Sequence, residues 1–215
     1  MRRTLPLILI VLGIILVGVV FVPLVASQIQ YLINKPIAMI DPSETSSVQA
    51  PYVSQVLGDY TQASSWFTNT PKSSPTSTKV SFYTLSIPSI NLKDVSVEIN
   101  GDDLKKSAVQ YPGTALPGTF GNTVIFGHST SPFLYKVGDP ISIFNPLLKT
   151  KIGDEIIIYF DGVTYRYIVK NIAEMDPDKI EVLAQRYDKY ELTLVTCTPL
   201  GTYLRRFVVR AELIN

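Results

Sequence analysis

The sequence holds one cysteine and one histidine in 215 residues, and both follow strand-like runs. Cys197 comes directly after the β-branched and apolar residues 192–196, and His128 follows the similar run 123–126 and then Gly127. Such runs predict strands, so we expect both side chains at strand ends. A thiol nucleophile needs a proton partner, and an imidazole can act as one. The two residues therefore predict nucleophilic catalysis if the fold brings these strand ends together.

Two adjacent arginines could place a positive charge beside the thiol. The turn-forming residues 199–201 separate Cys197 from a second strand pattern, Arg206–Leu213. If the two strands pair antiparallel, neighbouring residues point to opposite faces, so only one of Arg205 and Arg206 shares the face of Cys197. Arg205 alternates with the apolar residues of its strand, which should face the interior. We therefore expect Arg206 on the outer face, where it could stabilise negative charge.

Each of these residues also has an ordinary structural interpretation. A single cysteine is commonly a small buried side chain. A single histidine at a strand end is often structural or simply exposed, and arginines at the start of a strand are mostly solvated. Spacing alone does not decide between these interpretations and a catalytic site.

Longer motifs around these residues favour the catalytic interpretation. The strand pattern that ends at Cys197 resembles the TLxTC strand of the sortases. Sortases are membrane-anchored cysteine transpeptidases of the Gram-positive cell surface. The pattern here reads Leu192-Thr-Leu-Val-Thr-Cys197, and Thr198-Pro199 follows it. Arg206, nine residues after the cysteine, resembles the family's arginine in its position. Residues 111–118 and 121–128 resemble the approach to the catalytic histidine, and residues 87–92 resemble the opening strand. The resemblance covers about residues 80 to 215 and is closest in appearance to sortases of classes C, D and E.

The resemblance implies a mechanism and a set of site residues. Cys197 would attack the Thr–Gly bond of an LPxTG-like sorting signal and form a thioacyl enzyme, while His128 would act first as general acid and then as general base. Arg206 would hold an oxygen of the substrate or of the tetrahedral intermediate, and Thr196 and Arg205 would contact the substrate. The partners would be surface proteins or pilins that carry a sorting signal, and an amine acceptor from a cell-wall precursor or a pilin lysine. No cofactor and no metal are expected.

Two other classes of protein stay open. A papain-like protease would place its cysteine before its histidine, whereas His128 precedes Cys197 by 69 residues. A catalytically inactive, membrane-tethered β-barrel module that binds sorting signals would keep the fold without the chemistry. Gln110 stands where many sortases carry a second, non-catalytic histidine, so His128 is the one histidine available.

Residues 1–34 predict a cytoplasmic tip and a transmembrane signal anchor. Arg2 and Arg3 precede the 31 uncharged residues 4–34, and the apolar stretch 5–26 matches a hydrocarbon core of roughly 30 Å. A cleaved signal peptide is the competing interpretation, but its apolar region is shorter, and residues 25–27 fit its cleavage site poorly. Positive charge before the helix predicts a cytoplasmic N-terminus and an extracytoplasmic remainder, held at the plasma membrane of a Gram-positive type of cell.

Residues 35–78 predict an extracytoplasmic stalk. Between Asp41 and Thr78 there are 15 Ser or Thr and four Pro, and such a composition buries too little apolar surface to fold. Residues 52–57 and 64–67, which include the only tryptophan, interrupt the polar pattern. We interpret them as a chance apolar patch resting on the domain or on the membrane surface. The alternative is a lid over the active site, as in pilin-building sortases, but the Asp-Pro-aromatic triplet typical of such lids is missing.

Residues 79–215 predict one catalytic domain that is mainly β. Asp161-Gly162 predicts a hairpin turn, and Asp103–Val109 is the best candidate for a short helix. Short strands at this spacing are typical of an antiparallel barrel or sandwich. The resemblance implies a sortase-like closed antiparallel β-barrel with one or two short helices. The strand patterns cover residues 81–87, 95–99, 123–126, 155–160, 164–173, 191–196 and 206–213.

Composition argues against two further functions. The net charge is +1 and the Lys and Arg residues are scattered, whereas nucleic-acid binding needs a concentrated basic face. One cysteine and one histidine cannot supply the four ligands of a standard structural zinc site. Outside the cytoplasm a single cysteine has no partner within the chain, so its thiol is buried, reactive or a crosslink between two copies.

Overall fold

The computed structural model describes residues 10, 12–19, 21, 22, 25, 29, 59–66, 75, 77–177 and 179–214. The chain divides into two compact units, Met1–Ile37 and Ala38–Asn215, and each is considered by itself. In the first unit residues 12–19 are helical. Among the described residues, no helix has both the length and the apolar character needed to cross a membrane. Most of the predicted anchor (1–34) and most of the predicted stalk (35–78) lie outside the described residues.

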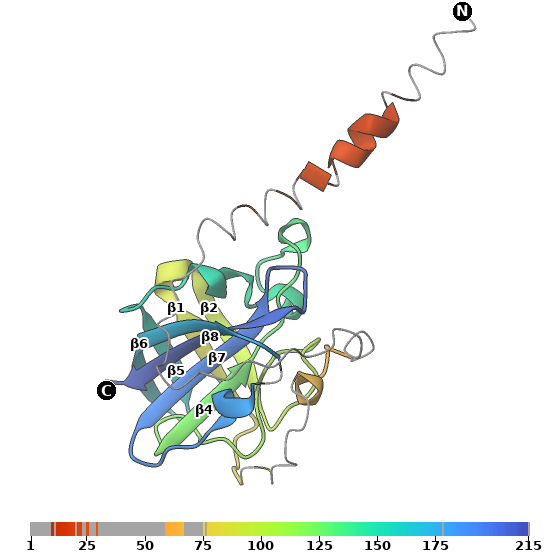
Figure 1. Cartoon of the computed structure of the whole chain (residues 1–215). Coiled ribbons are helices and arrows are strands. Elements are labelled where there is room, and N and C mark those ends of the chain that lie inside the picture. The colour runs from red at the N-terminus through yellow and green to blue at the C-terminus, as the bar shows by residue number, and fades with distance from the viewer. Residues whose placement is uncertain are drawn as a thin grey trace, which may run out of the picture. The chain divides into compact units, whose positions relative to one another are not determined.

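The second unit is built on a closed barrel of eight strands, in which neighbours follow the order β1-β2-β3-β4-β7-β8-β6-β5 (Figure 1). The strands are rich in β-branched and aromatic residues, which pack well on a pleated surface. This confirms the mainly β fold and the closed barrel. The strands are β1 (Phe82–Ile87), β2 (Leu92–Ile99), β3 (Ala108–Gln110), β4 (Gly121–Phe126), β5 (Glu155–Phe160), β6 (Val163–Met175), β7 (Tyr190–Thr198) and β8 (Arg205–Leu213).

The prediction that the barrel is antiparallel throughout is wrong for two of its eight strand pairs. Six pairs are antiparallel, but β2 pairs with β3 in parallel, and so does β4 with β7. Period-two patterning predicts that a segment is a strand and which face is buried, but it does not encode the direction of the neighbouring strand. The parallel β4–β7 pair matters most, because His128 follows β4 and Cys197 lies near the end of β7.

The predicted helix at Asp103–Val109 is also wrong. The Asp103 carboxylate accepts a hydrogen bond from the Lys105 N–H at 3.0 Å within a turn, and the residues that follow form β3. A strand of three residues is too short to show alternation, and its pairing with β2 and β4 decides its conformation. The helical segments among the described residues of this unit are short 3-10 turns: η1 (Ala63–Ser65), η2 (Pro88–Ile90), η3 (Pro132–Leu134), η4 (Pro140–Ser142), η5 (Asn145–Lys149) and η6 (Ile180–Leu183).

The hairpin predicted at Asp161-Gly162 is confirmed. These two residues connect β5 to β6, and Phe160 and Val163 are directly paired across the turn. Both turn residues have positive φ, 49° for Asp161 and 79° for Gly162. Asparagine, aspartate and glycine tolerate this conformation, which matches the twist of the two strands.

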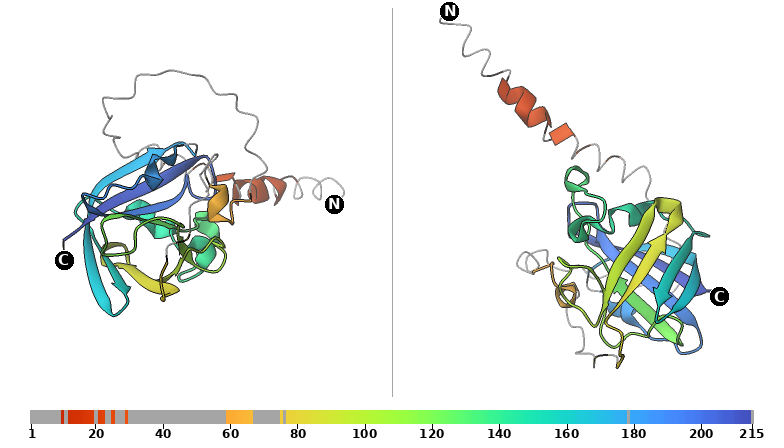
Figure 2. Two further views of the ribbon diagram at one scale, coloured as in Figure 1. Left: turned by 90° about the horizontal axis from the view of Figure 1, so that it is seen from below. Right: turned by 180° about the vertical axis from the view of Figure 1, so that it is seen from behind.

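Buried apolar side chains gather on both sides of the barrel wall. The inner cluster fills the barrel and includes Leu192 and Leu194 of β7. The outer cluster includes Val195 and Cys197 of the same strand, because successive side chains of a strand alternate between faces. Residues 59–66, which we call the cover segment, add Ala63 and Trp66 to the outer cluster (Figure 2, orange). The barrel therefore has a filled interior and a second apolar layer on its outside.

Candidate active site

Cys197 and Arg206 are directly paired across the antiparallel strands β7 and β8. Both side chains are on the outer face, and Arg206 Nη1 lies 3.6 Å from the Cys197 sulfur. After Arg205, the inward-pointing residues of β8 include Phe207, Val209 and Ala211, which belong to the inner cluster. The strand register that places Arg206, and not Arg205, beside the thiol is therefore confirmed.

The guanidinium of Arg206 is completely buried and is held by carbonyl oxygens. Nη1 donates to the Tyr203 oxygen at 3.1 Å and Nη2 donates to the Trp66 oxygen at 2.9 Å. Among the described residues Nε has no acceptor. A buried cation without a carboxylate partner keeps its capacity to stabilise an anion. Arg206 therefore has the geometry of an anion-stabilising group next to the thiol.

His128 lies just beyond β4, beside the end of β7. The Gly127 N–H donates to the Val195 oxygen at 3.1 Å, and the Thr196 hydroxyl donates to the Gly127 oxygen at 2.8 Å. On the other side of His128, the Ser129 hydroxyl donates to the Cys197 oxygen at 2.8 Å. These three bonds fix the chain that carries the histidine to the strand that carries the thiol.

Gly127 is required here for space. It is not among the glycines with positive φ, so its role is not to provide a backbone conformation that other residues avoid. A Cβ at this position would lie 2.4 Å from a ring carbon of Phe144, which is far below van der Waals contact. The Phe144 N–H in turn donates to the His128 oxygen at 2.9 Å. The phenylalanine packs where a side chain of residue 127 would be, and it helps to hold the histidine backbone.

The cover segment lies over the reactive residues. The Trp66 ring is 6.0 Å from the His128 ring, and Arg206 lies 5.1 Å from the Trp66 ring centre and 5.7 Å from that of Tyr60. Tyr60 also stacks on Tyr203, which follows β7, at 4.5 Å. Trp66 is 1% exposed, and Cys197 is 0% exposed. Trp66 was predicted to lie in the stalk, within an apolar patch resting on the domain or on the membrane surface, and it packs against His128 and Arg206.

The turn before β3 anchors the cover segment. The Asp102 carboxylate accepts hydrogen bonds from the Ser64 N–H at 2.7 Å and from the Ser64 hydroxyl at 3.0 Å. The Asp102 oxygen accepts from the Ala63 N–H, and the Leu104 N–H donates to the Thr61 oxygen, both at 2.9 Å. Sequence reasoning marked Trp66 as unusual but missed Asp102, because nothing in the pattern links two segments nearly forty residues apart.

Burial under the cover segment disfavours the charged forms of both reactive groups. Burial raises the pKa of the Cys197 thiol to about 11, and the positive charge of Arg206 opposes this only in part. Burial also lowers the pKa of His128, and the nearby charge of Lys105 lowers it further, against Asp59 and Asp103. The arrangement therefore holds a neutral thiol and a neutral imidazole at pH 7, a combination of low reactivity.

Two residues predicted to contact substrate occupy other environments. Thr196 is completely buried, on the face opposite to Cys197, and its hydroxyl is bonded to the Gly127 oxygen. Arg205 pairs with Asp176 at 3.0 Å and approaches Glu174 at 3.9 Å, both near the end of β6. Thr196 thus positions the strand end that leads to His128, and Arg205 is directed away from the thiol. The alternation of side chains places both on the other face of their strands.

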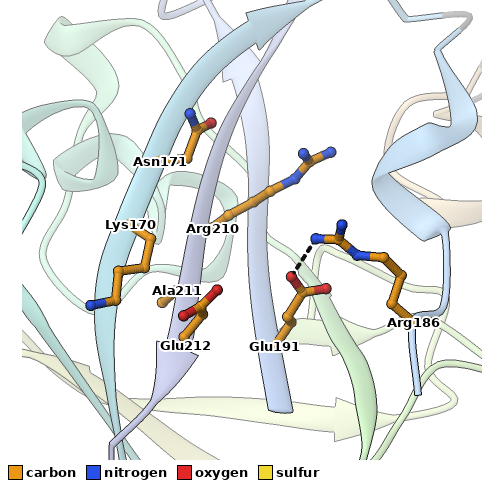
Figure 3. A pocket seen from close by; sticks show the side chains of 7 residues that line it. All are labelled: Lys170, Asn171, Arg186, Glu191, Arg210, Ala211 and Glu212. Carbon is orange, nitrogen blue, oxygen red and sulfur yellow. Dashed lines mark hydrogen bonds and ion pairs between the residues drawn. The ribbon is translucent and has the colours of Figure 1, made fainter. Parts of the chain in front are cut away.

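A polar hollow of about 230 Å³ lies at the opposite end of the β7–β8 pair (Figure 3). Arg186 and Glu191 form an ion pair of 2.7 Å at its wall. Glu191 is six residues from Cys197, which is about 20 Å along a strand. The hollow is therefore separate from the reactive residues. Its lining residues are Lys170, Asn171, Arg186, Glu191, Arg210, Ala211 and Glu212.

This barrel, with a thiol, a guanidinium and an imidazole at adjoining strand ends, matches a known family. A model of the Sortase domain matches residues 85–214, which is more than half of the chain, so the chain belongs to the sortase family. Sortase A of Bacillus anthracis is 31% identical over 132 residues, covering 61% of this chain and 59% of the relative. Sortase D of Bacillus subtilis strain 168 is 24% identical over 135 residues, covering 61% of this chain and 63% of the relative. The matches therefore span less than two thirds of either relative.

Solved structures agree with this assignment. A lid mutant of Sortase A from Corynebacterium diphtheriae superimposes with a TM-score of 0.55 at 29% identity, covering 65% of this chain and 73% of that structure. A Clostridium perfringens Sortase D5 transpeptidase gives a TM-score of 0.52 at 28% identity, with 63% and 79% covered. Sortases are cysteine transpeptidases, and this chain carries a single cysteine within the matched barrel.

Proposed function

We propose that this chain is a cysteine transpeptidase that cleaves an LPxTG-like sorting signal and transfers the acyl part to an amine. The observation that carries the proposal is the direct pairing of Cys197 with the buried Arg206, which has no carboxylate partner among the described residues and lies next to the strand end that leads to His128. Membership of the sortase family supports the same chemistry. The partners proposed are surface proteins or pilins with a sorting signal, and an amine of a cell-wall precursor or of a pilin lysine.

The proposed reaction has two acyl transfers. Cys197 passes its thiol proton to His128, and the thiolate attacks the carbonyl carbon of the Thr–Gly bond. The C–N bond breaks, and His128 gives that proton to the departing amine. A second amine then attacks the thioester and loses a proton to His128, and the sulfur leaves as thiolate. Arg206 is placed to stabilise the negative oxygen of each tetrahedral intermediate.

Substrate can reach the thiol only if the cover segment moves. Cys197 is 0% exposed, and the Trp66 oxygen already occupies a donor of Arg206. Contact with Arg206 and His128 favours the interpretation of this segment as a lid over that of a chance apolar patch. Displacing it would expose the thiol and free Nη2 for a substrate oxygen. The covered arrangement is then a resting state with a protonated, inaccessible nucleophile.

The membrane location belongs to the same proposal. The uncharged residues 4–34 after two arginines support a single-pass anchor with a cytoplasmic N-terminus. The barrel would then act outside the cytoplasm, at the plasma membrane of a Gram-positive type of cell. Residues between the anchor and the barrel would serve as the tether.

Trapping the acyl enzyme tests the proposal. The full chain is incubated with LPxTG-like peptides and a panel of amines, and intact and digested protein is analysed by mass spectrometry. We expect the acyl part of the peptide on Cys197 and its transfer to one of the amines. A chain that binds these peptides, but forms neither adduct nor transfer product after the cover segment is loosened, would be an inactive binding module.

A further inference from the structure

The loops that extend beyond His128 and Cys197 carry an exposed apolar surface. We call it the apolar rim. Its side chains are 39% to 83% exposed, although they are aromatic or aliphatic. Water-exposed apolar side chains are common singly, but a cluster of this kind marks an interaction surface. The rim consists of Phe133, Leu134, Tyr135, Val137, Ile141, Tyr203 and Leu204.

The two loops of the rim are in contact. Figures 1 and 2 show the loop after β4 beside the loop between β7 and β8. A Cβ on Gly201 would lie 3.1 Å from the Cα of Ser131, so the backbones meet closely. Ser131 is three residues after His128, and Gly201 is four residues after Cys197. The rim therefore borders the reactive end of the barrel.

Hydrogen bonds hold the first loop in a defined shape. The buried Ser142 hydroxyl accepts from the Lys136 N–H at 3.1 Å and donates to the Lys136 oxygen at 2.9 Å. At the base of the loop, Asn145 exchanges two hydrogen bonds with the Thr130 backbone, at 2.8 and 2.9 Å. The loop thus presents its apolar side chains outward from a fixed backbone. Such an arrangement is suited to a partner surface and does not result from an unstructured loop.

We propose that the apolar rim docks on the surface of the lipid bilayer. The two loops combine three exposed aromatic rings and four exposed aliphatic side chains with one exposed lysine, Lys136, and this composition is typical of segments that enter the interface between headgroups and acyl chains. The loop has one carboxylate, Asp139, and that group accepts a hydrogen bond from the Ile141 N–H. The surface thus offers little charge that a bilayer would repel.

The same chain supplies the reason for a bilayer as the partner. This inference rests on the proposed membrane anchor, residues 5–26, which would keep the barrel within reach of a bilayer at high effective concentration. Weak insertion of a few side chains is then sufficient for docking. Docking would turn the ends of β4 and β7 toward the membrane surface, where the cleavage site of a membrane-anchored substrate would be found.

Site-directed spin labelling in the full chain tests this inference. With Cys197→Ala removing the native thiol, Val137→Cys places a label on the rim, and Tyr187→Cys serves as the control. Val137 is 83% exposed and Tyr187 is 72% exposed, so neither change should disturb packing. Tyr187 lies near Gly121, at the start of β4, whereas the rim follows the end of β4. The labelled chains are placed in nanodiscs of phosphatidylcholine and phosphatidylglycerol.

We expect the label at position 137 to collide more with oxygen than with a water-soluble nickel complex, and the label at 187 to show the reverse. If chains recovered with the nanodiscs show labels at both positions that collide mainly with the nickel complex, docking of the rim is overturned while the membrane anchor still stands. Spin–spin broadening at 137 that disappears on dilution with unlabelled chain would overturn it in favour of contact between copies. Failure of the chain to incorporate would contradict the membrane anchor, and docking with it.

Discussion

The two faces of strand β7 differ in what they do. Its inner residues, such as Leu192 and Leu194, fill the barrel with apolar side chains. Its outer residues, Val195 and Cys197, lie under the cover segment with a buried arginine and a histidine close by. The inner face has little to offer beyond packing. The outer face combines packing with polar groups whose burial shifts their pKa values, so it is where stability and chemistry are coupled.

The largest expected effect comes from substituting one residue on each face of β7 and comparing the two variants. Cys197→Ala should lower cleavage and transfer to below about one per cent of the native rate, because the covalent route is lost, and should change the free energy of unfolding by about 1 kcal/mol or less. Leu194→Ala should do the opposite: it should cost about 2–5 kcal/mol of stability and leave turnover per folded molecule nearly unchanged. Denaturant unfolding and peptide turnover measure both. Residual hydrolysis above one per cent in Cys197→Ala would contradict a thioacyl route.

The inner face was largely predictable from sequence. The β-branched and apolar run 192–196 and the pattern 206–213 indicated two strands, and the alternation of side chains along the second strand correctly separated Arg205 from Arg206. The Asp161-Gly162 turn was predictable because its conformation depends on two adjacent residues. Where local chemistry decides the backbone, the sequence pattern is sufficient.

The outer face was less predictable, because its contacts join distant segments. The bond from Arg206 to the Trp66 oxygen spans 140 residues, and Asp102 reaches Ser64 across 38. Neither pair shows a period or a spacing. The same limit explains the missed β3 and the two parallel pairs, since pairing with distant strands determined them. The alternation rule could have excluded Thr196 as a substrate contact, because it points away from the face of Cys197.

The second expected effect tests which arginine belongs to the reactive face. Arg206→Ala should lower transpeptidation by at least about a hundredfold, because one charge-stabilising donor is lost. Arg205→Ala is the matched control and should stay near the native rate, since Arg205 pairs with Asp176 and Glu174. Arg206→Lys should recover little activity, because an ammonium lacks the planar arrangement of donors. Peptide turnover with thermal unfolding as a check on folding decides it, and a greater loss at Arg205 would contradict the assignment.

The third prediction weakens the cover segment without touching the barrel core. Asp102→Ala removes two hydrogen bonds to Ser64, each worth about 1.5–3 kcal/mol when the acceptor is charged and less where it is exposed to water. The uncovered state should become more populated, and alkylation of Cys197 should be about tenfold faster. Asp103→Ala is the control, because its carboxylate bonds within its own turn. Equal alkylation rates in both variants would mean that the segment does not govern access to the thiol.

The smallest expected effect compares the two faces through their titrating groups. The folded-state pKa of Cys197 is raised to about 11, above the unfolded value near 9, so its contribution to stability is complete below pH 9 and is lost as pH rises toward 11. On the inner side, burial raises the pKa of Tyr83 and raises that of Tyr167 to about 12, so the contribution of these tyrosines to stability is lost only above pH 10.

Measuring the free energy of unfolding from pH 8 to 10.5 in the native chain and in Cys197→Ala isolates the thiol, because both tyrosines are common to the two proteins. The difference between them should decline by roughly 1–2 kcal/mol over this range. A constant difference would mean that the thiol is already ionised or open to water, and that the outer face is less well covered than the contacts of Trp66 imply.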